Sequence, residues 1–346
     1  MNKRITFRSN RGYYSFLVEK KTLTVLTMLF VLTGIFLVIS VGVGSTIISP
    51  IEAMKTLFGY GFDQHTMIIV DLRLPRVTIA ILVGAAMAIS GGILQGVIRN
   101  PLASPDIIGI SGGAAFAAVT FITYFSETLS IKWLPLAAFL GALSISIIIY
   151  SLAWKKGVTP IRLVLVGIGI STITSSLTTL MIVLSPYSAA SQAYIWLTGS
   201  IYGSSWEDVI ALLPWLIIFI PLAFICGRSI NVQELGDDMA RSLGSHVQLH
   251  RGILVIISVA LAGSAVSIGG AIGFVGLIAP HIARKIVGSS FGSLLPVAAL
   301  IGSLIVILAD TVARTAFLPL DIPAGVFTAG IGAPFFIYLL YRNKNF

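Results

Sequence analysis

The stretch Gly270-Ala-Ile-Gly-Phe-Val-Gly-Leu-Ile-Ala-Pro-His-Ile-Ala-Arg284 decides the fold class of this chain. Glycines, a proline, a histidine and an arginine interrupt a segment that otherwise has the composition of a membrane span. Irregular backbone and ionisable groups are costly at bilayer depth, because lipid offers them no hydrogen-bond partners. They usually line a cavity or an interface between helices, so the stretch predicts a membrane transport protein.

The composition of the whole chain supports a membrane location. Of its 346 residues, 56% are hydrophobic and only 10% are charged, which is more apolar surface than one soluble core can bury. Apolar runs of about 20 residues, the length that spans a bilayer as a helix, recur along most of the sequence. We therefore expect an all-α polytopic membrane protein with about ten transmembrane helices, at 23–45, 75–97, 107–126, 132–154, 162–185, 208–227, 251–268, 271–288, 295–316 and 322–341.

The distribution of basic residues predicts the orientation of these helices. With a cytoplasmic N-terminus, only Lys55, Arg73, Arg76, Lys132 and Arg314 face outward, out of 22 lysines and arginines. Cytoplasmic loops of membrane proteins carry such an excess of positive charge, so both termini are expected inside. The net charge of +9 is then a topology signal and does not indicate a nucleic-acid partner.

The predicted organisation is a cytoplasmic N-terminal segment (1–22), a ten-helix domain (23–341) with a cytoplasmic loop at 228–250, and a short cytoplasmic tail (342–346). Two stretches of the domain also resemble each other weakly. An inverted repeat of two five-helix units would explain this similarity, and so would chance among residues that dominate both stretches; both interpretations stay open. The matching pairs are Gly84 and Gly263, Ala86 and Ala265, Ile89 and Ile268, Gly91 and Gly270, Ile93 and Ile272, and Pro101 and Pro280.

The segment Gly84-Ala-Ala-Met-Ala-Ile-Ser-Gly-Gly92 consists almost wholly of small residues. Small residues let helix backbones approach closely in lipid, so this helix is expected at the centre of the bundle or against a second subunit. Gln95, one turn further on, either faces a wet pathway or hydrogen-bonds to a neighbouring helix.

Two turns on the inner side are candidates for a gate. Arg99-Asn100-Pro101-Leu102-Ala103-Ser104-Pro105 contains two prolines that stop the preceding helix and define an irregular turn. Such a turn can narrow a pathway without the bulk of a helix, although it can also be a plain connection. Lys155-Lys-Gly-Val-Thr159-Pro160 forms a second inner turn that can join the same constriction.

Three outward-facing arginines lie at helix ends, Arg73 and Arg76 in Arg73-Leu-Pro-Arg76, and Arg314 near the end of the ninth predicted helix. Binding of an acidic surface would explain why they depart from the charge bias, and snorkelling anchors are the alternative. Asp310 precedes Arg314 by one helical turn, so we expect an ion pair between them.

A short amphipathic helix is predicted within the inner segment Asn231–Gly244. Asp237 and Asp238 fall in its first turn, where negative charge suits the helix dipole, and Gly244 ends it. Leu235, Met239 and Leu243 are spaced by four and form one apolar stripe. An apolar stripe facing the cytosol indicates docking to another protein or contact with lipid headgroups.

The sequence does not indicate catalysis or metal binding by this chain. His281 could bind a metal or haem, but a lone histidine after a proline is more often a structural, hydrogen-bonded residue. The sequence contains no Walker A pattern, no catalytic triad and no cluster with metal-ligand spacing. We expect neither enzymatic activity nor a cofactor nor a bound metal.

Taken together, these strings resemble the FecCD/BtuC-type permease family, the membrane subunits of ATP-driven importers for ferric siderophores, haem and cobalamin. The resemblance extends from Arg73 to Tyr341. It is carried by RLPR (73–76), the small-residue stretch with Gln95, RNPLASP (99–105), LGDDMARSLG (235–244), GAIGFVGLIAPHIAR (270–284), Asp310 with Arg314, and the closing IPAGVFTAGIGAPFF (322–336).

The resemblance implies a BtuC-like ten-helix subunit that dimerises, with an identical or a related permease, around a central pathway. Its partners would be ABC ATPase subunits, an extracytoplasmic substrate-binding (lipo)protein and membrane lipid. It implies ATPase coupling by Leu235, Gly236, Asp237, Ala240, Leu243 and Gly244, and binding-protein docking by Arg73, Arg76 and Arg314. It also implies an inner gate or pathway at Gln95, Asn100, Leu102, Thr159 and Pro160, and a structural signature at Gly276, Pro280, His281 and Arg284.

Two departures from the family pattern stand out. The family usually has Glu before the last Ile-Pro, where this chain has Asp321, and the stretch after Gly288 lacks the usual Asp-His-Arg-like residues. The resemblance predicts a permease subunit of an ABC importer in the bacterial plasma membrane that translocates a ferric siderophore. Haem or cobalamin import, an ion-coupled secondary transporter dependent on Asp310, and a haem enzyme that uses His281 are the alternatives.

Overall fold

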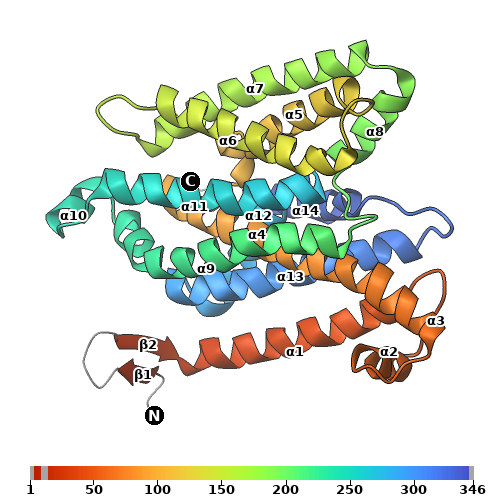
Figure 1. Ribbon diagram of the computed structural model, residues 1–346. Coiled ribbons are helices and arrows are strands. Elements are labelled where there is room, and N and C mark those ends of the chain that lie inside the picture. Colours follow the sequence, from red (N-terminus) through yellow and green to blue (C-terminus); the bar gives the residue numbers. More distant parts are fainter. Residues whose placement is uncertain (1–3, 9–14, 343–346) are drawn as a thin grey trace.

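The computed structural model describes residues 4–8 and 15–342 (Figure 1). The segment predicted at 1–22 holds an antiparallel hairpin that the sequence analysis did not predict, formed by β1 (Arg4–Arg8) and β2 (Ser15–Glu19). The first helix follows β2 directly. The predicted tail at 342–346 lies outside the described residues, apart from its first residue.

All ten predicted helices are present in the described part of the chain, with shifted ends. They are α1 (Lys20–Gly42), α4 (Leu74–Ile98), α5 (Ile110–Tyr124), α6 (Leu134–Leu152), α7 (Pro160–Leu184), α9 (Trp206–Glu234), α11 (Val247–Gly269), α12 (Val275–Val287), α13 (Phe291–Thr315) and α14 (Ala324–Arg342). Shorter elements connect them: α2 (Pro50–Leu57), α3 (Asp63–Thr66), the π-helical η1 (Met67–Arg73), the 3-10 turns η2 (Pro105–Ile108) and η3 (Ile131–Trp133), α8 (Tyr187–Thr198) and α10 (Asp237–Ser242).

Local sequence explains where several of these helices begin. Proline stands in the first turn of α4, α6 and α7, where its missing N–H is not needed by the helix. The N-terminus of α9 is closed by a capping box in which the Asp208 carboxylate accepts from the Ser205 backbone N–H at 2.8 Å. These four helices begin within two residues of their predicted starts.

Helix length separates the ten helices into two groups. Eight helical stretches of the described chain are long and apolar enough to cross a membrane, and in one of them α3, η1 and α4 run together over Asp63–Ile98. The segment between the first two predicted helices is therefore mostly helical. In contrast, α5 has 15 residues and α12 only 13. At about 1.5 Å per residue, α12 spans only part of a bilayer.

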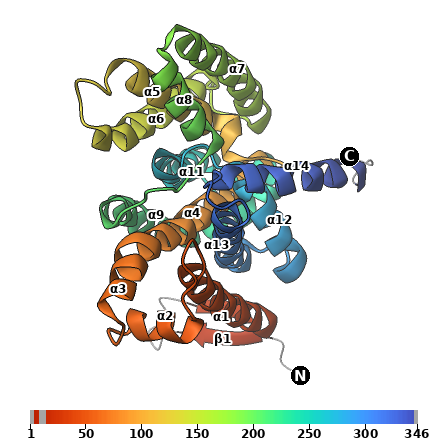
Figure 2. The same cartoon turned by 90° about the vertical axis from the view of Figure 1, so that its right-hand side faces the viewer.

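Helix α4 forms the centre of the bundle. Figures 1 and 2 show α4 among α9, α11, α12 and α13, with α1–α3 on one side and α5–α8 on the other. Small residues make this packing close: a Cβ added at Gly84 would overlap the Gly302 backbone of α13, and one at Gly91 would overlap the Gly276 carbonyl of α12. The central position expected from the small-residue stretch is confirmed.

Three of the six matching pairs join α4 to α11, and these two helices are buried to the same extent, over 78% of the most apolar part of each. They are joined by hydroxyl contacts, with the Ser90 and Ser258 Oγ atoms 2.6 Å apart. Each is the second long helix of its half of the chain, which agrees with an inverted repeat. The repeat itself stays a prediction.

Among the predicted boundaries that are wrong, two change how the inner and broken-helix regions are described. The helix predicted at 271–288 begins only at Val275, because Gly270 and Phe274 adopt positive φ angles of 67° and 66° and interrupt the helix. The helix predicted at 208–227 continues to Glu234. The cytoplasmic loop predicted at 228–250 is therefore mostly helical. Gly236, with a φ angle of 103°, separates α9 from α10.

Candidate functional site

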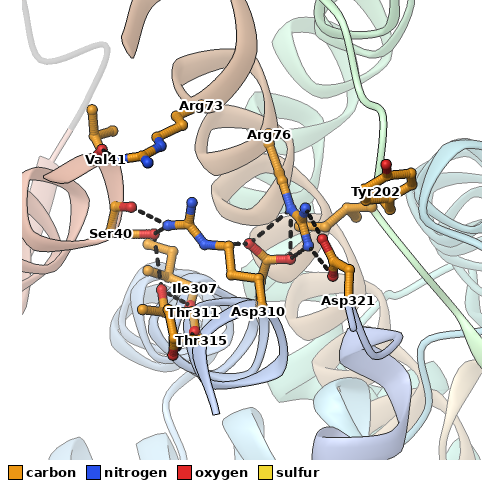
Figure 3. A network of polar contacts seen from close by, with 12 residues as sticks. Ser40, Val41, Arg73, Arg76, Tyr202, Ile307, Asp310, Thr311, Thr315 and Asp321 are labelled. Atoms are coloured by element: carbon orange, nitrogen blue, oxygen red, sulfur yellow. Dashed lines mark hydrogen bonds and ion pairs between the residues drawn. The ribbon is translucent and has the colours of Figure 1, made fainter. Parts of the chain in front are cut away.

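We call the end of the bundle with Arg76 the outer side and the end with α10 the inner side, following the expected orientation. At the outer side, Arg76 lies in the first turn of α4 and is bound by two carboxylates (Figure 3). Its Nε and Nη2 donate to Asp310 Oδ1 of α13 at 2.9 and 2.7 Å. Its Nη1 and Nη2 donate to Asp321, just before α14, at 2.7 and 2.9 Å. Arg76 therefore joins α4, α13 and the start of α14.

The other two outer arginines satisfy the carboxyl end of α1. Arg73 Nη1 donates to the carbonyls of Val41 and Gly42 at 2.8 and 3.0 Å, and Arg314 Nη2 donates to the carbonyl and hydroxyl of Ser40. The last carbonyls of a helix have no partners within the helix and carry its negative dipole end, so guanidinium groups stabilise them well. Ser40 was not singled out from the sequence, because nothing local marks it.

The expected ion pair between Asp310 and Arg314 is present, with Arg314 Nε 3.7 Å from Asp310 Oδ2. The closer partner of Asp310 is Arg76, on a different helix. The Asp310 side chain is 1% exposed and is shared by two buried guanidinium groups. The buried carboxylate that an ion-coupled transporter would require is therefore neutralised within the chain.

A pocket of about 530 Å³ opens beside this network. Its lining includes all three arginines predicted for docking, and the Arg76 guanidinium lies 5.5 Å from the centre of the Tyr202 ring. The guanidinium groups are thus buried within the network and border an outer pocket at the same time. They are not anchors extended toward lipid headgroups.

On the inner side the arrangement of charges is reversed, because one carboxylate serves two arginines. Asp237, in the first turn of α10, accepts from Arg99 at the end of α4 and from Arg251 Nη2 of α11, the latter at 2.8 Å. Arg251 also donates to the Val158 carbonyl in the second inner turn. Burial disfavours the charged carboxylate, but the hydrogen bond and charge of Arg251 and the charge of Arg99 lower the pKa of Asp237 below its ordinary value.

The predicted apolar stripe lies on the exposed side of the α10 region. Leu235, Met239 and Leu243 are 58%, 60% and 64% exposed, whereas Ala240 is fully buried. Gly244, at φ 79°, ends the segment as expected. Asp237 thus holds this region to the bundle, and its leucines remain available to a partner.

The five gate candidates lie near the end of α4 and in the two inner turns, and a shared gate stays a prediction. Gln95 is buried, and its Nε2 donates to the Leu277 carbonyl of α12 at 3.3 Å, which agrees with the structural alternative. Asn100 Oδ1 accepts from the Leu102 backbone N–H at 2.9 Å and shapes the first inner turn. Thr159 and Pro160 begin α7. Arg99 and Arg251 connect both inner turns to α10, and Arg251 was missed because it looks like one more cytoplasmic positive charge.

The signature residues follow the broken helix. Gly276 allows the contact with α4, and Pro280 lies inside α12. The hydrogen bond expected for His281 is not found within the described chain: both of its ring nitrogens are buried there without a partner, and the ring meets Phe335 of α14 edge-on at 5.8 Å. In the same part of the chain, Arg284 has two buried nitrogens without partners. Within the described residues, no group of three His, Cys, Asp or Glu side chains could hold a metal ion.

The fold and these two ionic networks define a helical membrane permease with a polar site at each end. The chain belongs to the FecCD transport family, whose family model matches residues 31–342. It is 49% identical to the Bacillus subtilis (strain 168) protein named "Probable siderophore transport system permease protein YfhA", over 94% of this chain and 97% of that protein. It is 45% identical to the achromobactin transport system permease protein CbrC of Dickeya dadantii (strain 3937), over 97% and 96%.

A solved structure supports the same assignment. An inward-facing structure described as a metal-chelate type ABC transporter matches with a TM-score of 0.82 and 31% identity, over 92% of this chain and 99% of that one. The chain is therefore an integral membrane permease subunit of an ABC importer, a transporter and not an enzyme. The family implies ATPase subunits and a second permease subunit as partners.

Proposed function

We propose that this permease imports an iron(III) chelate of the siderophore type, which an extracytoplasmic binding protein delivers to the outer pocket. The observation that carries the proposal is the construction of the two ends: three arginines border a pocket at one end, and an exposed apolar stripe lies at the other. A partner can thus bind at each face of one helical core. Relatives named for achromobactin and for iron(III) hydroxamate support the chelate class.

The outer pocket is suited to carboxylates. Arginine binds a carboxylate with two parallel hydrogen bonds, and such pairs are strong where water is partly excluded. Arg73 is the guanidinium best placed for an incoming acid, because within the described chain it bonds only carbonyl oxygens. We assign acidic side chains of the binding protein to this pocket, and an ATPase subunit to the α10 stripe.

Transport itself is the first test. Liposomes that contain the permease, its ATPase and the binding protein should accumulate ⁵⁵Fe-labelled ferric hydroxamate against a gradient when ATP is present. The permease alone, or the complex with a non-hydrolysable ATP analogue, should not. Accumulation by the permease alone would refute the proposal. Uptake of haem or cobalamin in place of ferric hydroxamate or ferric citrate would refute the chelate class.

The inner docking surface can be tested separately. Leu235→Asp with Leu243→Asp should abolish co-purification with the ATPase, because charged side chains would replace both ends of the apolar stripe. The variant with methionine at both positions keeps the apolar surface and should retain the complex. Normal co-purification of the aspartate variant would remove α10 from the ATPase interface.

For the outer surface, Arg73→Gln is the cleanest change. It removes a positive charge but leaves no carboxylate of the chain without its partner, whereas the same change at Arg76 would also disrupt Asp310. We expect weaker binding of the binding protein and a shallower dependence of its affinity on salt. An unchanged affinity and salt dependence would contradict the docking assignment.

A further inference from the structure

The outer pocket is already neutral before any partner arrives. Its arginines, Arg73, Arg76 and Arg314, are matched by the carboxylates of Asp71 and Asp321, which line the pocket, and of Asp310 behind it. An acidic side chain of a partner can still approach Arg73, which bonds only carbonyl oxygens within the described chain. To form a two-pronged bond with Arg76, however, it would have to replace a carboxylate of the chain itself.

Two carboxylates hold Arg76, and they differ in depth. Asp310 lies on α13, is 1% exposed and receives hydrogen bonds from the Nε and Nη2 atoms. Asp321 is 27% exposed and occupies the other edge of the guanidinium group, the Nη1 and Nη2 atoms. Asp310 is thus the structural partner, and Asp321 occupies the edge that is closer to the pocket opening.

Apart from its hydrogen bonds with Arg76, Asp321 has few contacts that hold it in place. Within the described chain, its carboxylate receives side-chain hydrogen bonds from Arg76 alone. It lies in the connection between α13 and α14, and the next residue along makes only a long backbone bond, from Ile322 N to Ala313 O at 3.4 Å. Solvent can rehydrate this carboxylate when it leaves, which is not true of Asp310.

We propose that Asp321 is a built-in substitute for the acidic side chain of the docking partner, and that docking exchanges the two carboxylates on Arg76. The inference rests on the proposed docking function. An acidic residue of the binding protein takes the Nη1–Nη2 edge, and Asp321 turns into the pocket opening. The exchange keeps Arg76 paired throughout, so no buried guanidinium group is left uncompensated.

The exchange has a consequence for α14. Only Ile322 and Pro323 separate Asp321 from the first residue of this helix, and proline makes that link stiff. Release of Asp321 removes one of the contacts that hold the start of α14, while the bond from Gly325 N to Gly199 O at 2.9 Å remains. Binding on the outer face thereby reaches a helix whose Phe335 contacts His281 of the broken-helix region.

The test uses the permease–ATPase complex in lipid nanodiscs, with the purified extracytoplasmic binding protein that supports uptake in the liposome experiment as the probe. Asp321→Asn removes the competing charge and should raise the affinity for the binding protein about tenfold. Asp321→Glu retains the charge and should bind like the parent chain. Asp71→Asn removes the same charge from the same pocket without freeing Arg76, and should raise affinity by no more than about twofold.

A second measurement reports on the mobility of the segment that connects α13 to α14. Amide hydrogen exchange across 318–325 should increase when the binding protein is added to the parent complex, and should already be increased in Asp321→Asn without it. Equal affinities of Asp321→Asn and Asp71→Asn, or unchanged exchange across this segment, would overturn the exchange of carboxylates. Failure of docking as a whole would appear instead as an Arg73→Gln variant that binds normally.

Discussion

The two ionic networks of this permease are mirror images in charge. On the outer side one guanidinium group, Arg76, is held between two carboxylates, and on the inner side one carboxylate, Asp237, is held between two guanidinium groups. Asp310 is 1% exposed, whereas Asp237 is 20% exposed. The outer network has a spare carboxylate that can be exchanged, and the inner network depends on a single one.

This difference indicates two kinds of coupling. Loss of one outer contact leaves Arg76 paired, so the outer end can release a segment and remain folded. Loss of Asp237 would disconnect α10 from α4 and α11 in one step, because both arginines use the same carboxylate oxygen. The inner end therefore connects α10, which we assign to the ATPase interface, to the inner turns as one unit.

The largest expected effect comes from Asp310→Asn. The change leaves Arg76 and Arg314 buried with one carboxylate fewer, and breaking a buried charge pair costs about 3–5 kcal/mol. Thermal unfolding of the detergent-solubilised permease should show a large drop in midpoint. Asp321→Asn is the matched control on the same arginine and should lose much less stability. Equal losses of stability would show that Asp310 is no more important for folding than Asp321, which would contradict the assigned difference.

Asp237→Asn should have the next largest effect. Arg251 is fully buried and would keep only neutral hydrogen-bond partners, at a cost of about 1–3 kcal/mol. Because α10 would no longer be held to α4 and α11, ATP-driven uptake should fall more than ATPase binding does. Uptake in proportion to the amount of assembled complex would show that Asp237 supports folding only.

A smaller effect is expected from acidification. The pKa of Asp237 is lower in the folded chain than in the unfolded chain, so its ionised form stabilises the fold at pH values above the ordinary carboxyl range, about 4. That contribution should be constant near neutral pH and disappear as the pH falls through the lowered pKa. The stability difference between the parent chain and Asp237→Asn, measured from pH 7 to pH 3, should therefore shrink at the acid end. A difference that grows with acidity would contradict this sign.

The smallest effect belongs to Arg241→Ala. Arg241 pairs with Asp238 at 3.1 Å on the surface of α10, where the two side chains are 57% and 98% exposed. Exposed pairs of this kind contribute less than about 1 kcal/mol. Unfolding and uptake should both stay close to those of the parent chain. A large loss of uptake with normal folding would instead place Arg241 in the ATPase interface.

Much of this arrangement was predictable because its signals are local. Apolar runs predicted the ten helices, the prolines marked several starts, and the spacing of Asp310 and Arg314 predicted their ion pair. The small-residue stretch from Gly84 to Gly92 predicted a central helix because close packing needs small side chains wherever the partner helix comes from.

Other features depend on residues that meet only in space. Asp321 and Arg76 are 245 positions apart, and their contact gives a role to the aspartate that departs from the family pattern. The residues next to Arg251 in the sequence do not indicate whether its side chain faces water or is buried. It is buried because α10 packs against it and supplies Asp237. The same holds for His281, whose ring nitrogens were expected to be hydrogen-bonded and have no partner among the residues that the structure describes.

Composition and the recurring apolar runs thus specified a helical membrane protein, because the cost of exposing polar backbone in lipid depends on each segment by itself. The pairing of charges was decided by the packed bundle. A guanidinium group binds whichever carboxylate the helices bring within about 3 Å, and helix packing depends on the whole chain at once. Which arginines are held permanently and which carboxylate can be exchanged therefore follows from the tertiary structure alone.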